Sequence, residues 1–121
     1  MGRIYEESRR HPRIPGEHRA QVRRVAPQGL EAFLKTRDVG PGGCALVSGG
    51  HIGLGAILEM VLNLGGRFVE AEGRVVYERR LFGGTFEVGI AFTSLPPSGR
   101  QVIDGLVLQR SAGRAQGTKA P

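Results

Sequence analysis

The placement of glycine constrains the fold of this chain more than any other feature of its sequence. Glycine accounts for 20 of the 121 residues, which is more than twice the usual share of about 7%. Four Gly-Gly pairs, at positions 42/43, 49/50, 65/66 and 83/84, punctuate short apolar runs. The glycines show no three-residue period, so a collagen-like fold is excluded. Short apolar runs between glycine-rich turns predict an all-β domain of many short strands.

Alternation of apolar and polar residues predicts where these strands lie. From Val69 to Tyr77 every second residue is apolar, small or aromatic, and the residues between them are mostly charged. This pattern predicts a strand with Val69 and Tyr77 both on the core side. The run from Phe86 to Phe92 alternates in the same way, so we expect a hairpin that turns at Gly83-Gly84. Six strands are expected in all, over residues 19–25, 30–39, 44–48, 57–64, 69–77 and 86–92.

The spacing of apolar residues changes after residues 96–97 (Pro-Pro). A stripe with helical spacing follows, formed by Val102, Ile103, Leu106 and Val107. We therefore predict a mainly all-β fold, a six-stranded antiparallel β-barrel with one C-terminal α-helix. This unit is expected to occupy residues 18–110, between a flexible N-terminal arm at 1–17 and a disordered polar tail at 111–121.

Positive charge gathers at the two ends of the chain. The formal net charge of +6 divides into +4 in residues 1–24, −1 in residues 25–99 and +3 in residues 100–121. Basic ends on a nearly neutral body suggest an anionic partner. A small basic barrel that binds RNA or DNA ranks last among the alternatives, because the few aromatic residues mostly occupy core-patterned positions and leave no stacking platform.

Several kinds of site are not expected from this sequence. Cys44 is the single cysteine, which rules out an internal disulfide and any Cys-x-x-Cys metal or redox site. The sequence contains no P-loop and no recognisable Ser/His/Asp or Cys/His arrangement, so we expect neither an enzyme nor a bound metal or cofactor. No N-terminal apolar run and no stretch of about 20 apolar residues is present, so we expect a cytoplasmic protein without membrane insertion.

Two short segments carry the residues with the most distinctive chemistry. Residues 9–13 read Arg-Arg-His-Pro-Arg, and Pro12 and Pro15 keep this region extended. Residues 38–43 read Asp-Val-Gly-Pro-Gly-Gly and offer a carboxylate on a glycine-rich turn. We expect the fold to bring these two segments together around an anion that also has hydrogen-bonding edges.

The order of these segments resembles that of a known family. An Arg-x-x-x-Arg element precedes the first expected strand, and an Asp-x-Ser-x-x-Gly-like turn follows the second. Residues 73–77 (Gly-Arg-Val-Val-Tyr) and 89–92 (Gly-Ile-Ala-Phe) match two later signature strands. From Ser8 to Arg110 the chain is similar to a PilZ domain, the bacterial receptor module for cyclic di-GMP.

The resemblance implies a single-domain cyclic di-GMP receptor. Its N-terminal arm is expected to become ordered on binding and so to signal to an unidentified effector protein. The ligand-binding residues that it implies are Arg9, Arg10, Arg13, Asp38, Gly40 and Gly43. Arginine donates a planar fork to phosphate oxygens or to guanine O6 and N7, and its flat face stacks on purines. In this picture Asp38 accepts hydrogen bonds from guanine N1–H and N2–H, which discriminates guanine from adenine.

One position departs from the family pattern. Gly40 stands where the family usually has serine, so a hydroxyl that would bind the ligand is missing. One such hydrogen bond is worth about 0.5–1.5 kcal/mol, or up to about tenfold in affinity. An alternative function is therefore a PilZ-like adaptor that binds proteins and no longer binds the nucleotide. For Gly40 and Gly43 we also expect a purely structural role, a positive φ in the turn, and for Asp38 a turn-forming role.

Overall fold

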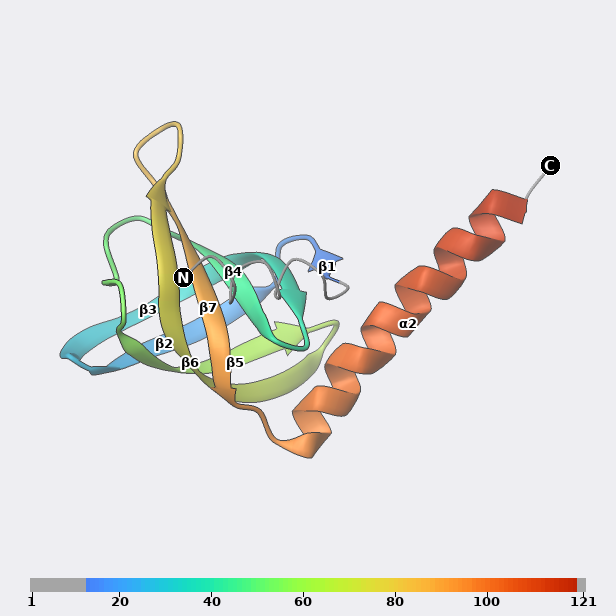
Figure 1. Cartoon of the computed structure of the whole chain (residues 1–121), viewed down its shortest axis with the longest axis horizontal. Helices are drawn as coiled ribbons and strands as arrows, with labels where there is room; N and C mark the ends of the chain where they lie inside the picture. The colour runs from blue at the N-terminus through green and yellow to red at the C-terminus, as the bar shows by residue number, and fades with distance from the viewer. Residues whose placement is uncertain (1–12, 120–121) are drawn as a thin grey trace.

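The computed structural model describes residues 13–119, and the strands within this range close into a barrel (Figure 1). Each strand pairs antiparallel with its neighbours in the order β3-β2-β5-β6-β7-β4, and a further pairing of β3 with β4 closes the ring. This confirms the predicted six-stranded antiparallel barrel. Its strands are β2 (Arg19–Ala26), β3 (Gln28–Gly40), β4 (Gly43–Ser48), β5 (Ile57–Leu64), β6 (Arg67–Arg80) and β7 (Phe86–Ser94).

The core lies inside the barrel, and the alternating side chains of the strands fill it. In β5 every second residue is buried, and β2 contributes its own alternate residues from the neighbouring position. Burial of these side chains is the main favourable term in folding. The fully buried large side chains include Val22, Val39, Leu46, Leu58, Leu62, Leu64, Val69, Val75 and Val88.

A bulge in β3 changes which side chains of this strand face outward. Thr36 pairs with Leu46, whereas Asp38 pairs with Ala45, so Arg37 is an extra residue without a partner position in β4. A bulge of this kind bends a strand and re-aims its side chains. Arg37 and Asp38, although adjacent in sequence, therefore both line the same hollow on the outside of the barrel.

A second bulge lies in β6 and overturns one sequence expectation. Val75 pairs with Ile90 and Tyr77 pairs with Gly89, so Val76 is the extra residue here. Val75 is buried in the core, and the bulge turns Tyr77 to the outer surface. The prediction that Tyr77 faces the core is wrong, because strict alternation across residues 69–77 cannot reveal an inserted residue.

A short strand, β1 (Ile14–Pro15), fixes the end of the N-terminal arm to the barrel. It pairs antiparallel with β3 at Val39 and Asp38. Thr36, which is fully buried, accepts a hydrogen bond from the backbone N–H of His18 (3.0 Å), and its hydroxyl donates to the carbonyl of Gly16 (3.0 Å). The arm predicted as flexible over residues 1–17 is thus anchored to the barrel in its described part.

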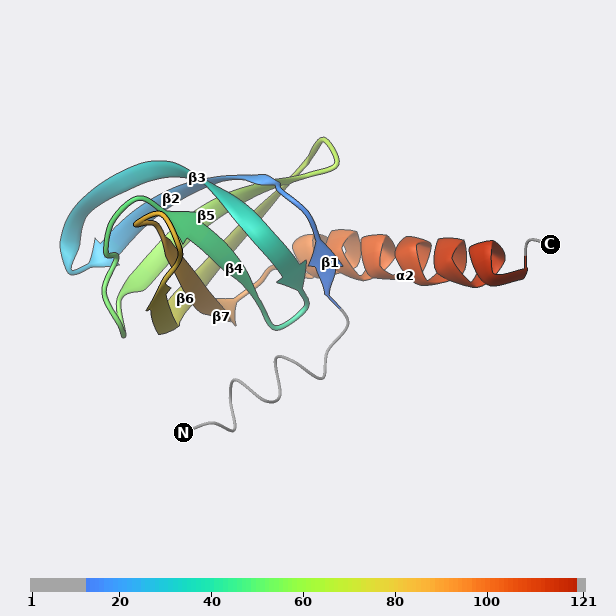
Figure 2. The ribbon, with the colours of Figure 1, turned by 90° about the horizontal axis from the view of Figure 1, so that it is seen from above.

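The C-terminal helix, α2 (Pro97–Lys119), packs its first turns on the barrel and then extends away from it (Figures 1 and 2). Ile103 of the predicted stripe is fully buried, and the other stripe residues pack against the core. The sequence predicted a disordered tail from residue 111, whereas the helix continues to Lys119. Alanine, glutamine and arginine in this segment are favourable helix formers, whereas Gly113 and Gly117 are unfavourable. No helix within residues 13–119 is long and apolar enough to cross a membrane.

Candidate ligand-binding site

A hollow of about 340 Å³ lies on the outer wall of the barrel where β3, β4, β7 and the second half of β6 run side by side. Its charged side chains are partly or largely exposed at its rim, except for the buried Glu87, and its other lining residues are mostly small or apolar. The two strand bulges supply Arg37, Asp38 and Tyr77 to this rim. The lining residues are Arg13, Arg37, Asp38, Cys44, Val76, Tyr77, Arg79, Glu87, Gly89 and Ile90.

Arg13 and Asp38, which belong to the two segments expected to meet, are in direct contact. The Arg13 guanidinium donates from Nη2 (2.5 Å) and from Nε (3.2 Å) to Oδ1 of Asp38. The pairing of β1 with β3 places Arg13 at this point, because the next residue, Ile14, is opposite Val39, the neighbour of Asp38. Both side chains are partly exposed, at 24% and 37%, so a ligand can reach them. Arg9 and Arg10 lie outside the described residues.

Gly40 and Gly43 face each other across the turn that joins β3 to β4. Both are buried. Neither is among the glycines with positive φ, so the expectation of a left-handed turn conformation was wrong for both. Gly43 is required for a different reason: a Cβ there would lie 2.0 Å from the carbonyl oxygen of Ile90. Only glycine allows β7 to approach β4 this closely, so Gly43 is needed for the packing of these two strands.

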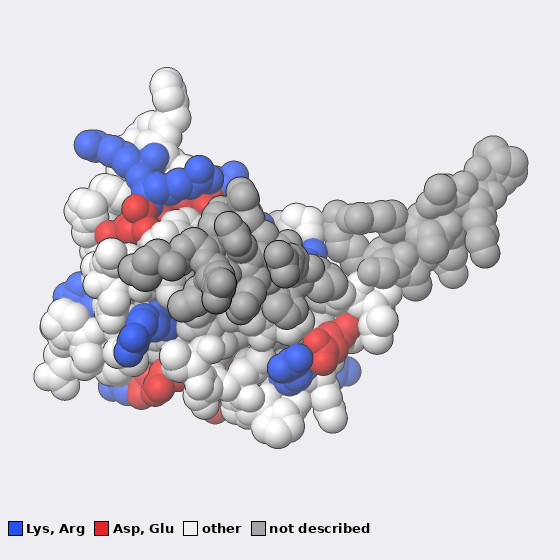
Figure 3. Space-filling view, viewed as in Figure 1, with Lys and Arg blue, Asp and Glu red and all other residues white. Residues whose placement is uncertain are grey.

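Glu87 is the centre of a hydrogen-bonded cluster that the sequence did not reveal. Its Oε1 accepts hydrogen bonds from Arg37 (2.8 Å) and Arg79 (3.2 Å), and its Oε2 accepts one from the Tyr77 hydroxyl (2.6 Å). Figure 3 shows basic and acidic atoms side by side just below the turn that joins β6 to β7, and the strand ends next to this turn carry Arg79 and Glu87. The β6–β7 hairpin and the sequence-distant strand β3 thus meet at one carboxylate.

The environment of Glu87 keeps this carboxylate ionised. Burial by itself raises the pKa of Glu87, but the hydrogen bonds from Tyr77 and Arg79 and the charges of Arg79 and Arg37 outweigh burial, and the pKa of Glu87 is lowered. Cys44 behaves differently, because burial raises the pKa of its thiol to about 12. Cys44 is therefore a buried wall residue without thiolate reactivity.

The two glycines of the later signature strands act through packing. A Cβ on Gly89 would lie 1.9 Å from Cε2 of Tyr77, so the tyrosine ring lies directly against the β7 backbone. A Cβ on Gly73 would lie 2.4 Å from a side-chain carbon of Ile90 inside the barrel. Gly89 therefore lets the Tyr77 ring settle where its hydroxyl reaches Glu87.

The structure brings Arg13 and Asp38 into contact, and it places Gly43 at the end of the β3–β4 turn, outside the lining of the hollow. The sequence did not reveal Arg37, Glu87 or the outward position of Tyr77. A charged residue at an expected core position would have indicated a buried charge. Glu87 gives no such indication, because it precedes the core residue Val88 and alternation therefore places it on the outer face. The bulges that assemble the cluster have no signature in the pattern.

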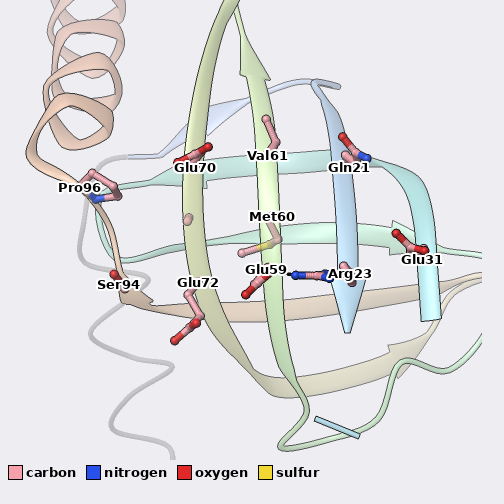
Figure 4. Close-up of a pocket in the computed structure, with 11 residues that line it drawn as sticks. Gln21, Arg23, Glu31, Glu59, Met60, Val61, Glu70, Glu72, Ser94 and Pro96 are labelled. Carbon is pink, nitrogen blue, oxygen red and sulfur yellow. Dashed lines mark hydrogen bonds and ion pairs between the residues drawn. The ribbon is translucent and has the colours of Figure 1, made fainter. Parts of the chain in front are cut away.

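The opposite wall of the barrel carries a different hollow, of about 540 Å³, formed by β2, β5 and the first half of β6 (Figure 4). Four glutamates line it, at positions 31, 59, 70 and 72, and one arginine, Arg23, pairs with Glu59. Both members of this pair are about half exposed. Within residues 13–119 no group of three or more His, Cys, Asp or Glu residues is arranged to hold a metal ion.

The site on the first wall thus combines arginine forks, one carboxylate beside an arginine, and a close-packed backbone floor. Arginine forks bind phosphate oxygens, and a carboxylate next to them can accept hydrogen bonds from a base edge. These chemistries together suit an anionic ligand with hydrogen-bond donors, such as a guanine nucleotide.

Comparison with solved structures shows the same fold in proteins of low sequence identity. The B. subtilis inhibitor of motility, MotI/DgrA, matches with a TM-score of 0.74 and 15% identity over 86% of this chain and 51% of that chain. The PilZ domain of YcgR from E. coli, solved with c-di-GMP, matches with a TM-score of 0.65 and 15% identity over 92% and 98%. The K. pneumonia MrkH–c-di-GMP complex matches with a TM-score of 0.67 and 16% identity over 89% and 54%.

This chain therefore spans about half the length of the MotI/DgrA and MrkH chains and nearly all of the YcgR domain. Comparison with curated proteins finds no matching sequence. The model of the PilZ domain family matches residues 7–109, which include both expected ligand motifs and the whole barrel. The chain belongs to the PilZ domain family.

Proposed function

We propose that this chain is a receptor module for cyclic di-GMP, which it binds on the wall formed by β3, β4, β6 and β7, and that it passes the signal to an effector protein rather than catalysing a reaction. The contact between Arg13 and Asp38 carries the proposal, because it joins the ends of two motifs that are 25 residues apart. Family membership and the solved c-di-GMP complexes of YcgR and MrkH support it.

The geometry suggests how the dinucleotide would be divided between the barrel and the arm. A hollow of about 340 Å³ is at the lower end of the range for small-molecule sites, about 300–1,000 Å³. It suits one base with its phosphate better than a whole dinucleotide. In the proposed complex Asp38 reads guanine, Arg13 donates to the phosphate or the base, and Arg9 and Arg10 hold the part that projects from the hollow.

Calorimetric titration with cyclic di-GMP tests this proposal. Arg13→Ala and Asp38→Ala should each weaken binding by about 10- to 100-fold, the effect of losing a hydrogen bond to a charged group. Arg23→Ala removes the same charge from the opposite wall and serves as the matched control, so it should leave affinity unchanged. If Asp38 reads guanine, cyclic di-AMP should bind far more weakly. Equal binding by wild type and both site variants would contradict the assignment.

The adaptor that binds proteins without nucleotide remains the second candidate, and Gly40 is the observation that favours it. The missing hydroxyl weakens any ligand contact at this turn, and Asp38 is already paired with Arg13. Gly40 does not have a positive φ, so its backbone conformation is open to serine. Gly40→Ser should strengthen cyclic di-GMP binding by up to about tenfold. If neither wild type nor Gly40→Ser releases or absorbs heat at high ligand concentration, the receptor function is excluded and the adaptor is the favoured function.

A further inference from the structure

Arg37 and Arg79 lie on the same wall as the Arg13–Asp38 pair, but they belong to neither of the two ligand motifs. Their guanidinium nitrogens contact one and the same oxygen, Oε1 of Glu87, at 2.8 and 3.2 Å. The two cations therefore converge at the rim of the hollow. Two guanidiniums repel each other, and the shared carboxylate between them offsets this repulsion.

The three groups are layered, and the layering decides which charge a ligand meets. The side chain of Glu87 is 9% exposed, whereas those of Arg37 and Arg79 are 48% and 63% exposed. The anion therefore lies underneath and the cations lie above it. An incoming ligand meets a positive surface, although the cluster includes a carboxylate.

Tyr77 holds the Glu87 carboxylate, which lies beneath the two arginines, in place. Its hydroxyl donates to the second oxygen of Glu87 at 2.6 Å, and its ring is held against Gly89. The β3 bulge sets the position of Arg37, and the β6 bulge sets those of Tyr77 and, two residues later, Arg79. The carboxylate consequently has a defined orientation, and so do the arginines that donate to it.

We propose that Arg37 and Arg79 form an oxyanion-binding pair on the barrel wall, with Glu87 and Tyr77 as positioning residues, and that this pair holds a phosphodiester group of the ligand. The identity of the ligand rests on the proposed function, whereas the oxyanion site rests on the geometry of the cluster. A guanidinium has five N–H donors in a planar fork, and this fork matches the geometry of phosphate oxygens, so an arginine that donates to Glu87 can also donate to a phosphate.

The pair also offers an explanation for how the site tolerates glycine at position 40. A serine hydroxyl offers one uncharged donor, whereas each arginine offers several charged N–H donors in a planar fork. Two such arginines on the barrel wall outweigh the loss of one hydroxyl. A ligand phosphate would then be held by the folded wall itself in addition to the arginines of the N-terminal arm.

Calorimetry with two probes, cyclic di-GMP and inorganic pyrophosphate, tests the pair separately from the receptor function. Arg37→Ala and Arg79→Ala should each weaken binding of cyclic di-GMP by about tenfold or more. The double variant should lose less than the product of the two effects, because both arginines share Glu87. Arg80→Ala, one residue along the same hairpin, removes an equal charge and should change affinity little.

Glu87→Gln and Tyr77→Phe test positioning against simple charge. Removal of the negative charge of Glu87 makes the wall more positive, so a pure charge effect would tighten phosphate binding. Positioning predicts the opposite sign, a loss of about threefold or more, because the arginines lose their shared acceptor charge. Tyr77→Phe keeps every charge and should weaken binding by a smaller factor. Thermal melts of each variant establish that it is folded at the temperature of the titration.

The outcomes separate the two proposals. If wild type binds cyclic di-GMP and the Arg37 and Arg79 variants bind it equally well, the oxyanion pair is overturned and the receptor function stands. Suppose that wild type and Arg80→Ala bind pyrophosphate but not cyclic di-GMP, and that the Arg37 and Arg79 variants bind neither. The oxyanion pair then stands and the receptor function fails. Binding of neither probe overturns both. Tighter binding by Glu87→Gln overturns the positioning role.

Discussion

Two opposite walls of one barrel place arginine beside glutamate, and they do so in different ways. On the wall of β2 and β5, Arg23 and Glu59 are directly opposite each other in the antiparallel pairing of the two strands, and both are about half exposed. On the wall of β3, β6 and β7, Glu87 is buried beneath two arginines and a tyrosine. The first arrangement is an exposed cross-strand pair, and the second is a layered cluster.

The difference shows what strand irregularities contribute to this fold. The pairing of β5 with β6 proceeds without a register shift from Ile57 to Leu64, and the side chains there simply alternate. Bulges in β3 and β6 break that alternation and turn Arg37 and Tyr77 toward one carboxylate. Exposed ion pairs contribute little to stability, whereas a buried carboxylate needs its partners. The walls should therefore respond differently to equivalent substitutions.

The largest effect is expected from filling the narrow space between β4 and β7 at Gly43. Gly43→Ala would put a Cβ 2.0 Å from the backbone oxygen of Ile90, and backbone cannot move aside as a side chain can. We expect a loss of about 3 kcal/mol in the free energy of unfolding, at the upper end for overpacking. Gly42→Ala is the matched control, since nothing lies within 4 Å of its Cβ position. Chemical denaturation measures both, and equal stability of the two variants would contradict the steric account.

A smaller effect, dependent on pH, is expected from Glu87. Its pKa in the folded state is below the ordinary value of 4.5, so its stabilisation is fully present above about pH 4.5 and is lost as the pH falls through the folded pKa. Glu87→Gln should cost about 2 kcal/mol at neutral pH, and the difference from wild type should shrink below pH 4.5. Thermal melts from pH 2 to 7 measure this. A difference that stays constant over that range would show that ionised Glu87 does not stabilise the fold.

The smallest effect is expected on the opposite wall. Glu59→Gln and Arg23→Gln each break an exposed pair, and solvent screens such pairs so strongly that they contribute little to stability. The free energy of unfolding of each variant should be nearly that of wild type, and added salt should reduce any difference further. Denaturation at low and high ionic strength tests this. A loss of stability as large as that of Glu87→Gln would show that the ion pairs on the two walls do not differ in their contribution to the fold.

Alternation and helical spacing were sufficient to predict most of the fold. The predicted strand over residues 57–64 coincides with β5, and the other five predictions fall within the observed strands. The apolar stripe around Ile103 packs on the barrel as expected. These features are periodic, and burial of one face enforces them over many residues.

The candidate site was predictable only where a motif carried it. Arg13 and Asp38 could be paired because Arg13 is the last residue of one recognisable segment and Asp38 is the first residue of the other. The contact of Arg37 with Glu87 spans 50 residues and depends on an inserted residue in β3. Such an insertion leaves composition and spacing almost unchanged, and only the pairing register shows it. The steric need for Gly43 depends likewise on how closely another strand approaches.

The assignment of ligand binding to the wall of β3, β4, β6 and β7 is tested most directly by NMR. Titration of the ¹⁵N-labelled chain with cyclic di-GMP should shift the amide resonances of Asp38, Tyr77 and Glu87 and leave those of Arg23 and Glu59 in place. Largest shifts on the wall of Arg23 and Glu59, or none at saturating ligand, would contradict the account.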